Sequence, residues 1–322
     1  MKKLERVIAR VKYLVGNICR RSAGMLSRHK IAIGLVVVVL LAISMQVLSF
    51  HEMGVTSEMG SVTPLTIEDI SSLPQIVIDD ATAVANDLYG DYLEKRDSFA
   101  NQLMASYYES KDKDFVVLFN SGGWGWKGIE NSTGWESIYK GIEGYLTVSG
   151  YEPVMLNYRR TVSTLQGCID EVLEMLTGYS SKTRELATRV EFLTRHDPDM
   201  KVILAGESNG SVISDSTMNA LEYNTRVYSI QTGPPFWHGW SKRDRILVLT
   251  DNGIVPDSFS NGQIWTMIKS TIKTSLGLND SKDVPTKVFL FFNAPGHYYE
   301  WEYPEVYARI TGFMKENFNR EW

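Results

Sequence analysis

The sequence predicts an α/β protein in which a mostly parallel sheet is flanked by helices. Three observations support this prediction: short apolar runs of strand length recur along the chain, stretches with helical spacing of apolar residues lie between them, and several of the runs end in glycine-containing turns. Strands that alternate with helices are joined by right-handed crossovers, so the strands run parallel and both faces of the sheet are covered. We expect this domain over residues 80–322.

The elements of the domain follow from the apolar patterns. Residues 80–110 have helical spacing, and the fully apolar run FVVLF is typical of a buried strand. The strands are expected at residues 115–119, 153–158, 201–205, 227–231, 246–249 and 288–292. The helices are expected at residues 165–193, with a break near 178–181, and at 211–221. No strand is evident before residue 115, which indicates a shortened sheet.

The composition excludes several classes of protein. The chain has 322 residues, of which 43% are hydrophobic and 22% charged, as in ordinary folded proteins. Its net charge of −5 gives no electrostatic reason to expect a nucleic-acid partner. The two cysteines, Cys19 and Cys168, are too few for a disulfide framework or a cysteine-based zinc site.

The N-terminal part of the chain predicts a membrane anchor. Residues 1–30 form a basic tail with a net charge of +8, which leaves −13 for the rest. Residues 31–50 carry no charge, and as a helix they are long enough to span roughly 30 Å of hydrocarbon. The long basic tail favours an uncleaved transmembrane signal anchor over a cleaved signal peptide, and places the N-terminus in the cytoplasm and the domain outside it. Residues 51–79 are expected to be a linker.

The pentapeptide at residues 206–210, GESNG, fits the G-x-S-x-G pattern of a nucleophile elbow. It follows the apolar run KVILA and opens a helical stretch, which is the strand-turn-helix setting that the pattern requires. Flanking glycines let the strand and the helix approach each other closely. We therefore predict that Ser208 is a nucleophile; the alternative is an ordinary serine that caps a helix.

A serine nucleophile needs a general base. His29 and His51 flank the expected membrane span, and His196 precedes the KVILA run, at the opposite edge of the sheet. His238 precedes every acid that suits the role. Elimination leaves His297, just after the last expected strand, as the general base.

The orienting acid is expected after the strand at residues 246–249, where Asp251 and Asp257 both occur. Asp251 is closer to the end of the strand and is the preferred residue, while Asp257 stays open as the second choice. Either aspartate also suits a turn.

Backbone donors for an oxyanion are expected in the glycine-rich segment NSGGWGW at residues 120–126. The N–H of Gly123 or of Trp124 is the first candidate, and the N–H of Asn209, after the nucleophile, is the second. A turn that only reverses the chain is the alternative.

These motifs, in the order Ser208, Asp251 and His297, resemble the α/β-hydrolase superfamily over residues 80–322. The resemblance implies the α/β-hydrolase fold and hydrolysis through an acyl-enzyme, with no metal or organic cofactor. A membrane-anchored serine esterase or lipase, acting on a lipid or small acyl ester, is therefore the expected function. An inactive protein of the same fold that binds partners at the membrane is the alternative.

Aromatic residues near the expected site suggest a substrate pocket formed by Trp126, Trp237 and Tyr298, although core packing explains them equally well. Residues 258–286 include an amphipathic helical stretch. This stretch is either a lid over the pocket or, as we prefer, an ordinary helix before the last strand.

Overall fold

A computed structural model describes residues 65–241, 243–278, 286–288 and 292–318. The tail, the expected membrane span and most of the expected linker lie outside these residues. Among the helices of the described residues, none has the length and hydropathy that a membrane span requires.

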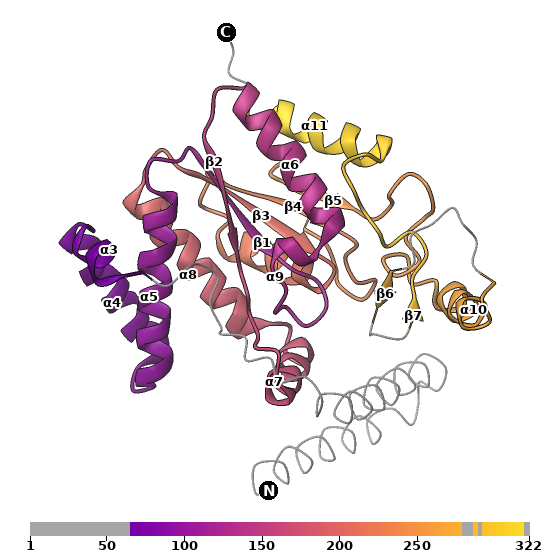
Figure 1. Ribbon diagram of the computed structural model, residues 1–322, viewed down its shortest axis with the longest axis horizontal. Helices are drawn as coiled ribbons and strands as arrows, with labels where there is room; N and C mark the ends of the chain where they lie inside the picture. Colours follow the sequence, from indigo (N-terminus) through magenta and orange to yellow (C-terminus); the bar gives the residue numbers. More distant parts are fainter. Residues whose placement is uncertain (1–64, 242, 279–285, 289–291, 319–322) are drawn as a thin grey trace, which may run out of the picture. The chain divides into compact units, whose positions relative to one another are not determined.

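The described residues form a five-stranded parallel sheet with the strand order β2-β1-β3-β4-β5. The strands are β1 (Phe115–Asn120), β2 (Pro153–Asn157), β3 (Lys201–Glu207), β4 (Val227–Thr232) and β5 (Ile246–Leu249). The helices that accompany them are α3 (Ile67–Ser71), α4 (Gln75–Tyr89), α5 (Leu93–Ser110), α6 (Thr133–Val148), α7 (Leu165–Leu176), α8 (Ser180–His196), α9 (Asn209–Ala220), α10 (Ile264–Ser275) and α11 (Pro304–Phe318). The α/β class, with a parallel sheet and flanking helices, is confirmed (Figure 1).

Side chains of the central strands alternate between two cores, as the pleat of a strand requires. Val116 and Leu118 of β1 pack into a cluster with residues of α4, α5, α8 and α9. Phe115, Val117 and Phe119 point to the other face, into a cluster with residues of α6 and α11. Both faces of the sheet are therefore covered, and α6 and α11 lie side by side on one of them (Figure 1).

Two predicted segments differ from the structure. The end of the expected linker is helical, because Thr66 and Asp69 form a capping box that starts α3, and α4 begins at Gln75. The described ends of the expected last strand, residues 288 and 292, do not join the parallel sheet. They belong to β6 (Lys287–Val288) and β7 (Phe292–Asn293), which pair antiparallel with each other.

Four connections meet at the carboxyl ends of the parallel strands. They are the glycine-rich loop after β1 (residues 121–128), the turn after β3, the loop after β4 and the loop after β5. In open parallel sheets this edge is the usual place for a ligand.

Candidate active site

Ser208 occupies a sharp turn between β3 and α9. Its φ of +50° and ψ of −117° are unusual for a residue with a side chain, which marks a strained backbone. The flanking glycines are required by contact: a Cβ at Gly210 would lie 2.0 Å from the carbonyl oxygen of Asn120, and one at Gly206 would lie 2.8 Å from Cα of Ser211. The strand-turn-helix arrangement that the sequence predicted around Ser208 is therefore present.

His297 connects this serine to a buried carboxylate. Its Nε2 lies 3.3 Å from Oγ of Ser208, and its Nδ1 lies 2.9 Å from Oδ2 of Asp257. His297 is buried, with 8% of its surface exposed. A Cβ at Gly233 would lie 2.6 Å from Cε1 of His297, so the glycine leaves the space that the ring occupies.

The carboxylate beside His297 belongs to Asp257 and not to Asp251, so the preferred acid of the sequence analysis is wrong. Oδ1 of Asp251 instead accepts a hydrogen bond of 2.7 Å from the N–H of Gly253, within a turn. The backbone of Asp251 also forms an antiparallel bridge with Pro256. This bridge folds the chain back after β5, so the aspartate that is six residues farther from the strand reaches the histidine.

Asp257 is fully buried, and its carboxylate accepts five hydrogen bonds. Oδ1 accepts from the N–H groups of Phe259 and Ser260, and Oδ2 accepts from His297, the hydroxyl of Ser260 and the phenol of Tyr299. Burial opposes ionisation, but the charge of His297 and the hydrogen bonds outweigh it and lower the pKa of Asp257. The carboxylate is therefore held in its charged form.

Tyr299 is a site residue that the sequence analysis did not assign. Its phenol lies 2.8 Å from Oδ2 of Asp257, and burial together with the charge of Asp257 raises its pKa well above the ordinary value. The phenol is therefore a permanent donor. Its position in the sequence could have indicated this role. Tyr299 follows His297 by two positions, and residues two apart in an extended segment point the same way.

The glycine-rich loop after β1 lies directly beside the serine. A Cβ at Gly122 would lie 3.1 Å from Cβ of Ser208. The N–H of Gly122 donates to Oε2 of Glu207 over 3.0 Å and is therefore occupied. Within the described part of the chain, the N–H groups of Gly123, Trp124 and Asn209 have no protein acceptor. These three are the amides that the sequence predicted as oxyanion donors.

A buried arginine, Arg160, holds this loop. Its guanidinium donates to the carbonyl oxygens of Ser121 and Gly123 and to Oδ1 of Asn120, and it forms an ion pair of 2.8 Å with Glu171. Burial opposes the charge of Arg160, but the pairing with Glu171 outweighs it and raises the pKa. Arginine is suited to this role because it presents several donors in a rigid plane.

The predicted aromatic pocket is only partly assembled. Trp124 and Trp126 stack on each other with ring centroids 6.1 Å apart. Trp237 is 45% exposed and contacts Phe259, whose ring in turn contacts His297. Tyr298 lines a cavity beside His297, whereas Trp126 and Trp237 do not.

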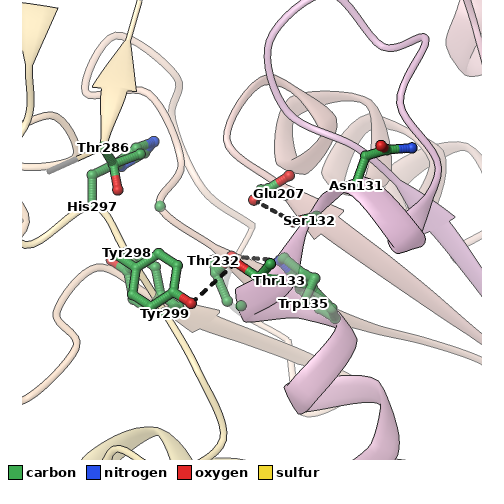
Figure 2. Close-up of a pocket in the computed structure, with 12 residues that line it drawn as sticks. Asn131, Ser132, Thr133, Trp135, Glu207, Thr232, Thr286, His297, Tyr298 and Tyr299 are labelled. Carbon is green, nitrogen blue, oxygen red and sulfur yellow. Dashed lines mark hydrogen bonds between the residues drawn. The ribbon is translucent and has the colours of Figure 1, made fainter. Parts of the chain in front are cut away.

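Figure 2 shows the residues that line this cavity. Its volume is about 170 Å³. Its walls come from the start of α6 and the residues just before it, the ends of β3 and β4, the residue before β6, and the segment after β7. Its lining residues are Asn131, Ser132, Thr133, Gly134, Trp135, Glu207, Thr232, Gly233, Thr286, His297, Tyr298 and Tyr299. Helix α10 contributes no lining residue; its Met267 packs with Phe259 and Phe292 instead.

No group of three or more His, Cys, Asp or Glu side chains within the described ranges is arranged to hold a metal ion.

No protein-family model matches the chain, and no curated protein matches it. Among solved structures, it is similar to Trichoderma reesei cutinase in complex with a C11Y4 phosphonate inhibitor. The TM-score is 0.32 and the identity 13%, over 61% of this chain and 83% of the cutinase chain.

Proposed function

We propose that this protein is a serine hydrolase that cleaves carboxylic esters, with Ser208 as nucleophile, His297 as general base and Asp257 as orienting acid. One observation carries the proposal: Oγ of Ser208, the two ring nitrogens of His297 and the buried carboxylate of Asp257 form a continuous chain of contacts of 3.3 and 2.9 Å. Ser208 lies at one end of this chain, in a strained turn. Asp257 lies at the other end, with a charged carboxylate that accepts several hydrogen bonds. Both features suit nucleophilic catalysis.

In the first half-reaction, Oγ of Ser208 attacks the carbonyl carbon of the ester, and Nε2 of His297 takes the hydroxyl proton. The carbonyl π electrons move onto oxygen and form an oxyanion. When the oxyanion collapses, the bond between the carbonyl carbon and the alcohol oxygen breaks, and the proton on Nε2 passes to that oxygen. The alcohol leaves, and the acyl group stays on Ser208.

In the second half-reaction, water attacks the acyl-enzyme and gives a proton to Nε2 of His297. The bond between the carbonyl carbon and Oγ then breaks, and the proton returns to Ser208. The net reaction is ester plus water to acid plus alcohol. The carboxylate of Asp257 holds the tautomer of His297 with Nδ1 protonated and stabilises the imidazolium.

The oxyanion is assigned to two backbone N–H groups. The N–H of Asn209 is at the start of α9, where helix N–H groups have no intrahelical acceptor and the helix dipole is positive. The second donor is the N–H of Gly123 or of Trp124. The occupied N–H of Gly122 excludes that amide from the role.

The proposal extends to the fold and the location. Strand order and the placing of the serine after β3 support an α/β-hydrolase arrangement. Residues 31–50 are proposed as a single membrane anchor with the N-terminus in the cytoplasm and the catalytic domain outside it, since the basic tail precedes the apolar stretch.

The test is covalent labelling of the full chain, solubilised in detergent, with a fluorophosphonate probe. Wild type is expected to label, Ser208→Ala to lose labelling entirely, and His297→Ala to label much more slowly. Ser71→Ala, an exposed serine on α3, is the matched control and keeps wild-type labelling. Folded wild type that does not label, and that hydrolyses no ester, contradicts the proposal and favours a binding protein.

A further inference from the structure

We infer that the cavity beside His297 receives the alcohol part of the ester, and that this alcohol is small, uncharged and rich in hydroxyl groups. The inference rests on the proposed function, which it deepens by naming the substrate class. Three features of the cavity carry it: its position, its size and its lining.

The position of the cavity places it on the alcohol side of the reaction. His297 lines it, whereas the predicted oxyanion donors Gly123, Trp124 and Asn209 do not. In ester hydrolysis the histidine must reach the oxygen of the leaving alcohol to protonate it. A group bound next to the imidazole, in a cavity that the three oxyanion donors do not line, is therefore assigned to the leaving alcohol.

The size of the cavity limits this group. An apolar cavity of about 150 Å³ holds one benzene molecule. The volume of about 170 Å³ here therefore accommodates a group of similar size, such as glycerol or a single sugar ring. A long alkyl alcohol would have to extend out of it.

The lining consists largely of hydrogen-bonding groups. The hydroxyl oxygens of Thr133 and Tyr298 lie 3.2 Å apart, and the hydroxyl of Ser132 donates to Oε1 of Glu207 over 2.9 Å (Figure 2). Each of these oxygens retains capacity for a further bond. An alkyl group in the cavity would desolvate them without compensation, whereas hydroxyl groups of an alcohol replace the bonds to water.

The charge of the wall excludes anionic alcohols of this size. Glu207 brings a carboxylate to the wall, so an anionic alcohol is repelled. Each of its oxygens accepts one hydrogen bond from a neutral donor, Gly122 N–H or Ser132 Oγ, and can accept another from a hydroxyl group. The neighbouring hydroxyls of Thr133 and Tyr298 act as both donors and acceptors, which matches a neutral polyol.

The experiment compares three butyrate esters that share one acyl group: glyceryl monobutyrate, propyl butyrate and butyrylcholine. The full chain in detergent is assayed for kcat/KM with each. The kcat/KM for glyceryl monobutyrate is expected to be about tenfold higher than that for propyl butyrate, because its hydroxyl groups form one or two additional hydrogen bonds. Thr133→Val, which replaces a hydroxyl by a methyl group, and Tyr298→Phe are each expected to reduce this preference at least threefold.

Thr82→Val is the matched control, since Thr82 is exposed on α4, and it keeps the wild-type preference. Equal kcat/KM for the glyceryl and propyl esters, or a preference for butyrylcholine, overturns the inference while the hydrolase function stands. So does an unchanged preference in both Thr133→Val and Tyr298→Phe. If no ester is cleaved and the fluorophosphonate probe does not label Ser208, the proposed function itself fails.

Discussion

The phenol of Tyr299 donates a hydrogen bond of 2.8 Å to Oδ2 of Asp257, the same oxygen that accepts from His297. Tyr299 and Asp257 are both buried, with 5% and 0% of their surfaces exposed. The bond favours the charged form of Asp257 and is one of the causes that lower its pKa. Tyr299 therefore stabilises the charged form of the Asp257 carboxylate.

Tyr299→Phe is expected to destabilise the protein in a pH-dependent way. A folded-state pKa below the unfolded value of about 3.9 gives Asp257 a stabilising contribution that is present above that pH and is lost as the pH falls through the folded pKa. Removal of the phenol weakens this contribution. Urea unfolding is expected to show a loss of about 1–2 kcal/mol near neutral pH and a smaller loss in acid. Tyr92→Phe, at an exposed position, is the control; an equal loss at both pH values contradicts the assignment.

The two aspartates after β5 give a direct test of the acid. Asp257→Asn is expected to lower kcat by about 10³–10⁴-fold, because an asparagine donor turns His297 into the wrong tautomer. Asp251→Asn is expected to change kcat only a few-fold, since the carboxylate of Asp251 bonds the N–H of Gly253 and does not contact His297. The effect of each substitution is measured from the rates of ester hydrolysis and of fluorophosphonate labelling. A larger loss in Asp251→Asn would reinstate the sequence-based assignment.

Local patterns sufficed to predict the sheet strands and the serine turn. The apolar runs at β1 and β3 are continuous because those strands are buried on both faces, and the glycines at 206 and 210 report a close approach of backbone. Such features depend on neighbours in sequence, so one sequence is enough to infer them.

The errors concern contacts that depend on the path of a loop. Asp251 was preferred as the acid because it is closer to the end of β5. The bridge between Asp251 and Pro256 folds the chain back, however, so that Asp257 reaches His297 instead. Arg160 gave no signal either, because its partners Asn120 and Glu171 are brought together only by packing. Neither contact has a sequence spacing that reveals it.

Cys168 is expected to resist thiol reagents in the folded protein. It is buried on α7, and burial together with the charge of Glu171 raises its pKa to about 11. In the Cys19→Ser variant, where Cys168 is the single thiol, Ellman's reagent at about pH 8 is expected to react about a hundredfold more slowly before unfolding in urea than after it. Similar rates in both states would show that the thiol is accessible.

Arg160→Lys tests whether the buried guanidinium positions the glycine-rich loop. Lysine keeps the charge but cannot reach Ser121, Gly123 and Glu171 at once, so the loop amides are expected to move from their positions. A displacement of about 1 Å at such a site lowers the reaction rate by up to about 10²-fold. The loss is expected in kcat more than in KM, because oxyanion donors stabilise the transition state. Arg159→Lys, at the neighbouring half-exposed arginine, is the control and leaves kcat within a few-fold. Circular dichroism of each variant separates a local effect from unfolding. A folded Arg160→Lys protein with wild-type kcat would show that the loop holds its geometry without the guanidinium.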